Sequence, residues 1–389
     1  MKILLVGDYG VIHTRRYLDL ILKAGCDVVL LNTGGHITRM DALPAKAWRN
    51  WPRSGRRPLS YVLGKTSADK LGDFIVRLQL RWLWAKTQPD IAHVQWIDDK
   101  AWLVGKTGIS PLILNAWGSD LNSTKDPNHD PVLLRQKAEV IAQASLLIAD
   151  SQDMIEIASD LAGFFVRSTL LPIGIDTTLF KPGMQAAARN LRKRLKIPET
   201  STVVLSPRAF RENYGHETIV DAFTGAIRRT NIDAYLVFKA YDCWDRSYIK
   251  KITRLAAEHH IEERIRIIEE MPYRELPAYY AIGEFAINFP AADAFPVTFI
   301  ECLACELPVL TKRLPAYDSL GIAPYLRFTD TTSQASLESG ISDMLSCVTS
   351  AKPDMTKARA YVSANFDEAV IADSLAAAYH RVLDAEKKY

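Results

Sequence analysis

The chain has 389 residues, of which 48% are hydrophobic. This length is too great for one ordinary core and predicts two domains, and the apolar fraction excludes a disordered chain. The 48 basic and 45 acidic residues leave a net charge of +3, a near balance that argues against a nucleic-acid-binding protein.

Cysteine usage and hydropathy indicate a reducing compartment. The five cysteines are an odd number at scattered positions and make no disulfide framework. No charged and apolar leader opens the sequence, and no apolar run approaches the ~18 to 20 residues of a spanning helix. We therefore expect a cytoplasmic protein, either free or at the inner face of the membrane.

The first half of the chain predicts one parallel sheet. Residues 2–7 and 27–32 are apolar strands on either side of a helix that ends near Leu22, and together they form a βαβ unit. Further apolar strands are predicted at 91–96, 112–117, 146–150 and 168–173. Because ligands of open parallel sheets bind beyond the carboxyl ends of the strands, the loops after these strands should hold the working groups.

Polar residues and glycines follow several of these strands. Gly7 and Gly10 allow a tight turn with close backbone approach, and His13 follows either as an acceptor or phosphate contact or as a helix cap. His93 and Gln95 fall on one face of their strand, where His93 is interpreted as a core histidine with satisfied hydrogen bonds.

A basic and aromatic stretch lies between Arg39 and Lys86, where eleven Lys or Arg stand against three Asp and no Glu. Anionic lipid attracts such residues by about 1 kcal/mol per basic side chain, and tryptophan favours the membrane interface. Arg56, in this stretch, is therefore a candidate for acceptor or membrane contact. The alternative is that residues 49–60, rich in Arg, Pro and Gly, are a solvated loop.

The second half repeats the βα alternation after a break at residues 174–183 that contains Gly and Pro. Strands are predicted at 202–207, 234–240, 264–268 and 285–289. Arg208 and Arg211 follow the first of these strands and are candidates to bind a diphosphate, because arginine offers a permanent charge and paired donors. The alternative is a surface arginine pair.

The segment 288–308, NFPAADAFPVTFIECLACELP, has two carboxylates eight residues apart, Asp293 and Glu301. Pro296 is expected at the first position of a helix, where its missing donor costs nothing. Amides around this helix start would point outward and receive a diphosphate without a metal. Glu301 then faces a ribose diol, and Asp293 faces the sugar.

This segment resembles the acidic-x7-acidic signature of retaining glycosyltransferases of the GT-B fold, family four, in the variety with Asp first. Matching stretches at 1–32, 89–96, 115–121, 148–154, 171–183 and 206–223 extend the likeness over nearly the whole chain. The resemblance implies an α/β protein with two Rossmann-like parallel-sheet domains facing a central cleft. Residues 1–175 would take the acceptor and 176–366 the nucleotide sugar, with the helix in 367–389 packing back on the first domain.

The resemblance also implies roles for individual residues. It assigns catalysis to Asp293, Arg208, Arg211 and His13. It assigns donor binding to Glu301, Phe295, Val297, Thr298, Met271, Tyr273 and Gly10. It assigns the acceptor side to Asp120 and Trp117, which join Arg56, the acceptor-side candidate from the basic stretch.

The chain departs from the family pattern at several places, among them Glu306, which stands where a glycine usually follows the signature helix. Trp117 stands where related enzymes often have a histidine that touches the reacting sugar. Tyr214 and Gly215 occupy the place of a Lys-Gly pair, so Arg211 is expected to substitute for the lysine. Lys239 lies where the family commonly has a Gly-x-Gly-Pro turn.

The predicted function is transfer of a hexosyl unit, with retention, from a UDP- or GDP-sugar to a glycan, lipid-linked or small-molecule acceptor. No Asp-x-Asp motif for a metal-bound nucleotide sugar occurs, and Cys302 and Cys305 have no second Cys or His pair. We therefore expect no metal and no cofactor. The alternatives are a nucleotide-sugar 2-epimerase of the same fold and a sugar-nucleotide-binding module without activity.

Overall fold

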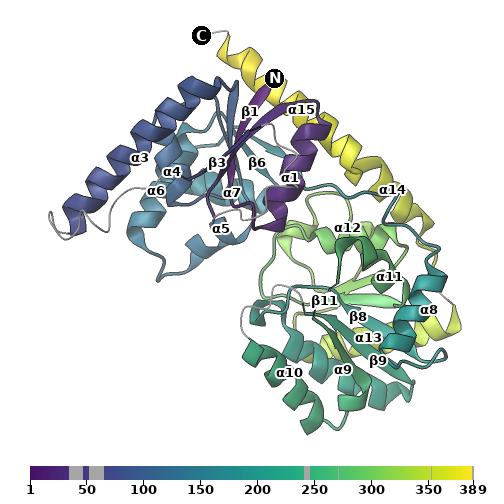
Figure 1. Ribbon diagram of the computed structural model, residues 1–389. Coiled ribbons are helices and arrows are strands. Elements are labelled where there is room, and N and C mark those ends of the chain that lie inside the picture. The colour runs from purple at the N-terminus through teal and green to yellow at the C-terminus, as the bar shows by residue number, and fades with distance from the viewer. Residues whose placement is uncertain (35–46, 52–64, 241–245, 270, 352, 388–389) are drawn as a thin grey trace. The chain divides into compact units, whose positions relative to one another are not determined.

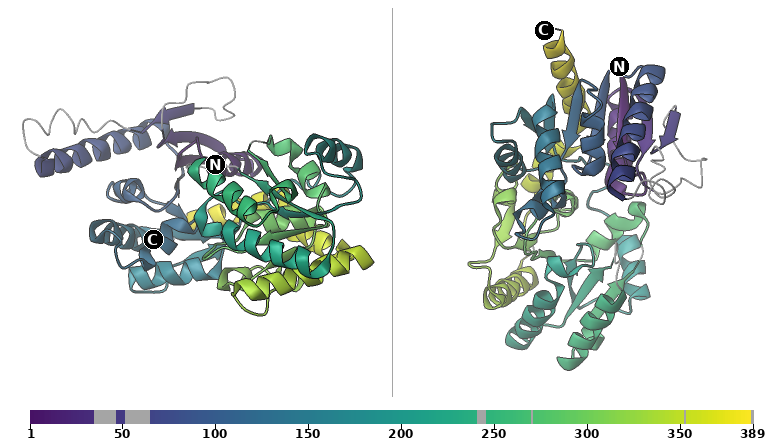
Figure 2. Two further views of the ribbon diagram at one scale, coloured as in Figure 1. Left: turned by 90° about the horizontal axis from the view of Figure 1, so that it is seen from below. Right: turned by 90° about the vertical axis from the view of Figure 1, so that its left-hand side faces the viewer.

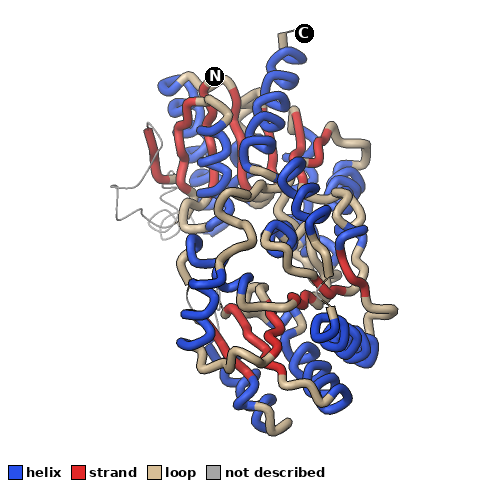
Figure 3. The backbone as a smooth tube through the Cα atoms, turned by 90° about the vertical axis from the view of Figure 1, so that its right-hand side faces the viewer, coloured by secondary structure: helices blue, strands red, loops and turns tan. Residues whose placement is uncertain are grey.

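The structure is a computed structural model that describes residues 1–34, 47–51, 65–240, 246–269, 271–351 and 353–387. The chain divides into two compact units, Met1–Gly174 with Glu368–Tyr389, and Ile175–Asp367. Each unit contains one parallel sheet with helices packed around it (Figures 1 and 3). The predicted α/β class with two Rossmann-like sheets is confirmed.

The first unit has a seven-stranded sheet in the order β3-β2-β1-β4-β5-β6-β7. All of its strand pairs are parallel. The strands are β1 Lys2–Gly7, β2 Asp27–Asn32, β3 Ala47–Asn50, β4 Ile91–Gln95, β5 Leu112–Asn115, β6 Leu146–Ala149 and β7 Ser168–Leu170. The helices are α1 Ile12–Lys23, α3 Lys65–Thr87, α4 Asp99–Gly105, α5 Ser119–Asn122, α6 Pro131–Gln143, α7 Gln152–Ala162 and α15 Glu368–Glu386.

The second unit has a six-stranded parallel sheet in the order β10-β9-β8-β11-β12-β13. The strands are β8 Thr202–Ser206, β9 Ala234–Lys239, β10 Ile265–Ile268, β11 Phe285–Asn288, β12 Val309–Thr311 and β13 Leu326–Phe328. The helices are α8 Gln185–Arg194, α9 His216–Thr230, α10 Arg246–Glu258, α11 Leu276–Ala281, α12 Val297–Ala304, α13 Gln334–Ser350 and α14 Thr356–Phe366.

Apolar runs explain why these strands lie inside their units. In β1, the four residues Ile3, Leu4, Leu5 and Val6 are each at most 1% exposed, so both faces of the strand are covered. A parallel strand with helices on both sides reads as a continuous apolar run rather than an alternating one. Polar residues are found instead at the carboxyl ends of the strands, at the edge of the sheet from which the chain continues into the next helix.

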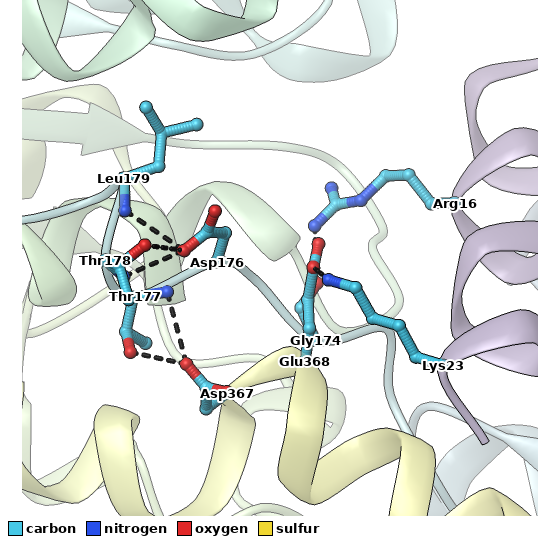
Figure 4. A network of polar contacts seen from close by, with 9 residues as sticks. All are labelled: Arg16, Lys23, Gly174, Asp176, Thr177, Thr178, Leu179, Asp367 and Glu368. Carbon is cyan, nitrogen blue, oxygen red and sulfur yellow. Dashed lines mark hydrogen bonds and ion pairs between the residues drawn. The ribbon is translucent and has the colours of Figure 1, made fainter. Parts of the chain in front are cut away.

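The chain passes between the units after residues 174 and 367, and these two passages lie side by side (Figure 4). Ile175 pairs with Asp367 in an isolated parallel bridge. The amide of Thr177 donates to the Asp367 carboxylate at 3.3 Å. On the first unit, Arg16 Nη2 donates to the carbonyl of Gly174 at 2.5 Å. The segment that leaves the first unit after residue 174 is thus hydrogen-bonded to the segment that returns to that unit after residue 367.

Several predicted boundaries differ from the observed ones. The strand predicted at 91–96 ends at Gln95, because Trp96 turns out of the sheet with φ +89°. The strand predicted to 207 ends one residue before Pro207, which has no amide to continue the ladder. Pro296 is the N-cap of α12 rather than its first residue. The last helix begins at Glu368, one residue later than expected.

Candidate functional site

Polar residues from three loops meet at one edge of the second sheet. The strands β9, β8 and β11 are neighbours in that sheet. Lys239 ends β9, Arg208 follows β8, and Asp293 follows β11. Because the carboxyl ends of parallel strands share one edge, these residues lie where ligands of such sheets bind.

Arg208 is held by contacts on both its edge and its face. Its Nη2 lies 2.8 Å from Oδ1 of Asp293, and both side chains are less than a tenth exposed. Its Nη1 donates to the Thr298 hydroxyl at 3.4 Å. The Tyr214 ring covers the guanidinium with its centroid 4.4 Å from the central carbon, a distance typical of a cation–π contact. The arginine is therefore oriented before any ligand arrives.

A glycine fixes the turn that presents Tyr214. Gly215 has φ +66°, and a Cβ at this position would lie 2.4 Å from the carbonyl oxygen of Phe289. Both the backbone conformation and the close approach require glycine here. At the point where the family has Lys-Gly, this chain thus keeps the glycine turn and places an aromatic ring against Arg208.

The second carboxylate oxygen of Asp293 also has protein partners. Oδ2 accepts from the Tyr317 hydroxyl at 3.0 Å and from Asn288 Nδ2 at 3.4 Å. Burial raises the pKa of Asp293, while the charge of Arg208 and the two hydrogen bonds oppose this shift. The carboxylate is thus a positioned acceptor whose negative charge depends on Arg208.

Glu301 lies one turn inside α12 and is 4% exposed. Its Oε2 accepts a hydrogen bond from the Tyr280 hydroxyl at 2.6 Å. Burial of Tyr280, followed by the nearby charge of Glu301, raises the pKa of that phenol, so it stays a donor. A buried carboxylate on the first turns of this helix is of the type that accepts hydroxyl donors from a ligand.

Lys239 adds a second buried cation to this edge. It is 7% exposed, and burial lowers the pKa of its ammonium while the charge of Glu301 opposes that shift. Arg208 is close enough to disfavour the charged lysine as well. Sequence reasoning marked Lys239 only as a departure from the family. The signal that was available is a lysine at the end of an otherwise apolar strand.

The N-terminus of α12 lies beside these side chains. Val297 and Thr298 are its first residues, and the first amides of a helix have no intrahelical acceptor. The helix dipole adds roughly half a positive charge at that end. Phe295 is 4% exposed and stacks on Phe366 with centroids 5.6 Å apart, so its side chain belongs to the core. If Phe295 contacts the donor as predicted, it does so through its backbone amide and not through its side chain.

Arg211 lies farther along the same loop and is half-buried. Its carbonyl accepts from Nδ1 of His216 at 3.2 Å. Burial lowers the pKa of His216 to about 4, so the ring is neutral and donates from Nδ1. The backbone at Arg211 is thereby fixed to α9, and the role of its side chain stays a prediction.

Met271 and Tyr273 were predicted to lie near the nucleobase. Both are partly buried against the core of the second unit, and the Tyr273 ring packs on Phe180 with centroids 5.3 Å apart. They follow β10, at the same edge of the sheet as Lys239.

The turn after β1 in the first unit is shaped by side chains of its own unit. A Cβ on Gly7 would lie 2.9 Å from Thr14 and 3.0 Å from Gln95, so this glycine allows α1 to pack closely on the sheet. The amide of Gly10 donates to Asp8 Oδ1 at 2.8 Å. The predicted approach of a ligand to Gly10 stays a prediction.

His13 and Trp117 come together in the first unit. Their rings stack with centroids 4.7 Å apart and an angle of 22°. The edge of Trp117 meets Tyr17 at 5.4 Å. The N-cap of α1 is Val11, so His13 does not occupy the capping position. The catalytic candidate His13 and the acceptor-side candidate Trp117 therefore form one aromatic pair.

A chain of hydrogen bonds links Trp117 to the last helix. Trp117 Nε1 donates to Gln95 Oε1 at 3.2 Å, Gln95 Nε2 lies 3.1 Å from His93 Nε2, and His93 Nδ1 lies 2.7 Å from the Tyr379 hydroxyl. The indole can only donate, so the Gln95 oxygen faces Trp117 and its amide nitrogen donates to His93. His93 then carries its proton on Nδ1 and donates to Tyr379. Burial lowers the pKa of His93 to about 3, which keeps this neutral form, and its interpretation as a core histidine is confirmed.

Asp120 anchors the loop that carries Trp117. Its carboxylate accepts from the amides of Ile97, Trp117 and Leu121 at 3.0 to 3.1 Å. It is 2% exposed, and burial raises its pKa to about 6 against the effect of these bonds. Asp120 therefore positions the loop, and its contact with an acceptor stays a prediction.

Some of the predicted site residues lie outside the residues that the structure describes. Arg56 and most of the basic stretch before residue 65 lie outside the described residues. Among the described residues, no group of three or more His, Cys, Asp or Glu is arranged to hold a metal ion. Within the same part of the chain, none of the helices has the length and apolarity needed to cross a membrane.

Two sequence families match the two halves of the chain. Residues 2–151 match the family "Glycosyl transferase 4-like", and residues 188–358 match "Glycosyl transferases group 1". The chain spans about half the length of the curated relatives it matches. D-inositol 3-phosphate glycosyltransferase 1 of Catenulispora acidiphila is 23% identical over 58% of this chain and 56% of its own length. D-inositol 3-phosphate glycosyltransferase of Acidothermus cellulolyticus is 26% identical over 46% of this chain and 40% of its own length.

Solved structures share the fold over nearly the full chain. Anabaena HepE in complex with UDP superposes with a TM-score of 0.77 at 16% identity and covers 98% of this chain and 100% of its own. Sucrose-phosphate synthase from Thermosynechococcus elongatus gives 0.76 at 18% identity, covering 99% and 100%. At this identity the likeness concerns the fold. The two family matches, which together cover residues 2–151 and 188–358, show that the chain belongs to the family-four glycosyltransferases, and the solved structures show that it shares their GT-B fold.

Proposed function

We propose that the protein is a retaining glycosyltransferase that moves a hexosyl unit from a UDP- or GDP-sugar to a glycan, lipid-linked or small-molecule acceptor. The observation that carries the proposal is the ion pair of Arg208 and Asp293 beside the buried Glu301, at the carboxyl ends of β8, β9 and β11. Family membership supports the reaction class. UDP-glucose is the first donor to test, because Anabaena HepE is seen with UDP-glucose.

In this mechanism the second unit binds the donor. Glu301 accepts the ribose hydroxyls, and Asp293 orients hydroxyls of the sugar. When the bond between sugar and diphosphate breaks, negative charge grows on the phosphate. Arg208, Arg211 and the start of α12 stabilise that charge, and a fixed donor of this kind is often worth ~3 to 4 kcal/mol. Lys239 joins this set as a buried cation of the same edge.

The acceptor is bound by the first unit, at the aromatic pair of His13 and Trp117. Retention follows if the acceptor attacks from the face that the leaving group vacates. The acceptor's proton then passes to the phosphate oxygen that breaks from the sugar, so no enzyme base is needed. The positive charge for this step comes from side chains and the helix, and we propose that the reaction is metal-independent.

The test is incubation of UDP- and GDP-sugars with the purified protein, with and without candidate acceptors. Acceptor-dependent release of nucleotide, with an anomeric configuration unchanged by proton NMR and a rate unaffected by EDTA, is expected. A product inverted at C2 identifies an epimerase, and binding without turnover identifies a non-catalytic module. At donor concentrations below KM, Glu301→Gln should slow the reaction severalfold, whereas Glu156→Gln, at an exposed position of α7, should not.

A further inference from the structure

Helix α3 carries an apolar stripe on its solvent side. Leu71, Phe74, Leu78 and Trp82 are exposed by 37%, 49%, 49% and 59%. At 3.6 residues per turn their spacing of three, four and four residues places them within an arc of about 80°. Four large apolar side chains in one row differ from the singly scattered ones that are normal on a protein surface.

This stripe is separate from the face that α3 packs on its own unit. Val76, Leu80 and Leu83 are at most 4% exposed and make up that buried face. The same helical geometry puts the stripe roughly 150° around the helix from them. In Figures 1 and 2, α3 runs along the outer edge of the first unit, and among the residues that the structure describes no other helix or strand lies on its outer side. Burial in the unit's own core therefore does not explain the stripe.

Cationic side chains border the stripe. Lys86 Nζ lies 4.6 Å from the ring centre of Trp82, and the Arg77 guanidinium lies 6.0 Å from that of Phe74. Lys70 is exposed on the same border as Arg77. The two acidic residues of the helix, Asp69 and Asp73, fall on the opposite side of it by the same periodicity. The surface around the stripe is thus positive.

We propose that this outer face of α3 docks on an anionic lipid surface, with the helix lying along it and Leu71, Phe74, Leu78 and Trp82 entering the headgroup region. An amphipathic helix with Trp, Phe and Leu on one side and Lys and Arg beside them is suited to that position. Lipid phosphate and carboxylate groups complement the bordering cations. A second copy of the chain, paired through the same face, would bring like charges together.

The proposal does not depend on the proposed reaction, because lipid binding is measured without donor or acceptor. The full-length protein is sedimented with vesicles of phosphatidylcholine alone or with 30% phosphatidylglycerol. We expect binding to the anionic vesicles only, falling at least fivefold when salt is raised from 0.05 to 0.5 M. Phe74→Ser with Trp82→Ser should lower binding at least tenfold at unchanged melting temperature, because both side chains lie outside the core.

The matched control is Phe164→Ser with Phe165→Ser, another pair of exposed aromatic residues, 52% and 79% exposed, in the same unit. This control should bind vesicles like the wild type. Neutralising Lys70, Arg77 and Lys86 to glutamine should remove the preference for anionic lipid. The proposal is overturned if the wild type does not bind, if the control pair rather than the stripe abolishes binding, or if the stripe variant instead converts a dimer to a monomer in sedimentation velocity.

Discussion

Arg208 and Asp293 are each other's counter-charge, with Nη2 2.8 Å from Oδ1 in a setting where both side chains are largely buried. One of them is expected to meet the diphosphate and the other the sugar. A donor that engages Arg208 therefore competes with Asp293 for the same guanidinium. Substituting each residue in turn can therefore distinguish binding of the diphosphate from binding of the sugar.

Asp293→Asn should separate donor-phosphate binding from turnover. With the carboxylate charge removed, Arg208 is free to pair with phosphate, so the affinity for UDP should rise severalfold while kcat falls at least 100-fold. Calorimetry with UDP and steady-state kinetics measure the two effects. Tyr317→Phe is the control, since it removes one hydrogen bond to Asp293 and leaves the ion pair intact. A loss of UDP affinity in Asp293→Asn would contradict this account.

Arg208→Ala should lower kcat more than donor affinity, because the phosphate charge is greatest when the bond to the sugar breaks. A loss of ~3 kcal/mol, or about 100-fold, is expected, with a smaller loss for Arg211→Ala. The variant also leaves Asp293 buried without its cation, which destabilises the fold by roughly 3 kcal/mol. Adding Asp293→Asn should restore the melting temperature but not the rate. If both single variants keep wild-type kcat, the phosphate site lies elsewhere.

Glu301→Ala should weaken donor binding strongly. A buried carboxylate that accepts ribose hydroxyls contributes ~1.5 to 3 kcal/mol per charged hydrogen bond, so the donor Kd should rise at least tenfold in calorimetry. Tyr280→Phe, which removes only the hydroxyl bonded to Glu301, should have the smaller effect. Unchanged affinity in Glu301→Ala would remove this residue from the donor site.

Asp120 should make stability fall as pH rises through the mildly acidic range. Its folded pKa of about 6 exceeds the ordinary value of 3.8, so the folded state binds more protons than the unfolded state between these two values. Its contribution to the free energy of unfolding therefore decreases from about pH 4 to about pH 6, by on the order of 3 kcal/mol. Urea unfolding of wild type and Asp120→Asn across this range measures the difference, which should shrink as pH rises. A difference that grows instead would mean the pKa is lowered.

Gln95→Leu should raise the KM for acceptor and leave the KM for donor unchanged. The substitution leaves the Trp117 indole and His93 without their shared partner and costs about 1 to 3 kcal/mol in stability. The position of Trp117, and with it the ring of His13, is then no longer fixed. Tyr379→Phe breaks the chain at its far end and should change stability with little effect on acceptor KM. Equal effects of both variants on acceptor KM would argue against a role of Gln95 in positioning Trp117.

The sequence alone was sufficient for most of the strands, because their apolar runs are local, but the short strands β3, β12 and β13 were not predicted. Residues 27–32 are a strand where predicted, and the strand predicted at 285–289 is observed at 285–288, since buried parallel strands are apolar along their whole length. The strand ends were less predictable. Trp96 is apolar and continues the pattern of β4, yet its positive φ takes it out of the sheet. The short strand Ala47–Asn50 overlaps residues 49–60, which were considered as a solvated loop. It forms by pairing with β2, and the local sequence of the strand does not indicate this partner.

The candidate site was predictable only in part. Asp293 and Glu301 are close in sequence, so a turn and a helix start place both of them. Tyr280 donates to Glu301 from α11, and the charge of Glu301 acts on Lys239 at the end of β9, at positions that local patterns do not connect. Similarly, the pairing of His93 with Tyr379 joins residues 286 positions apart. Such interactions depend on the order of the strands in the sheet. The spacing of residues within one segment of the sequence does not indicate that order.

The bridge between Ile175 and Asp367 makes the second unit an uninterrupted insert whose two ends are neighbours. A fragment cut at these points would begin and end in one paired position and would keep its whole sheet, its core and the Arg208–Asp293 pair. Neighbouring ends of this kind favour excision and circular permutation. The nucleotide recognition that we propose should therefore be measurable in a piece of fewer than 200 residues, without the proposed acceptor-side residues of the other unit.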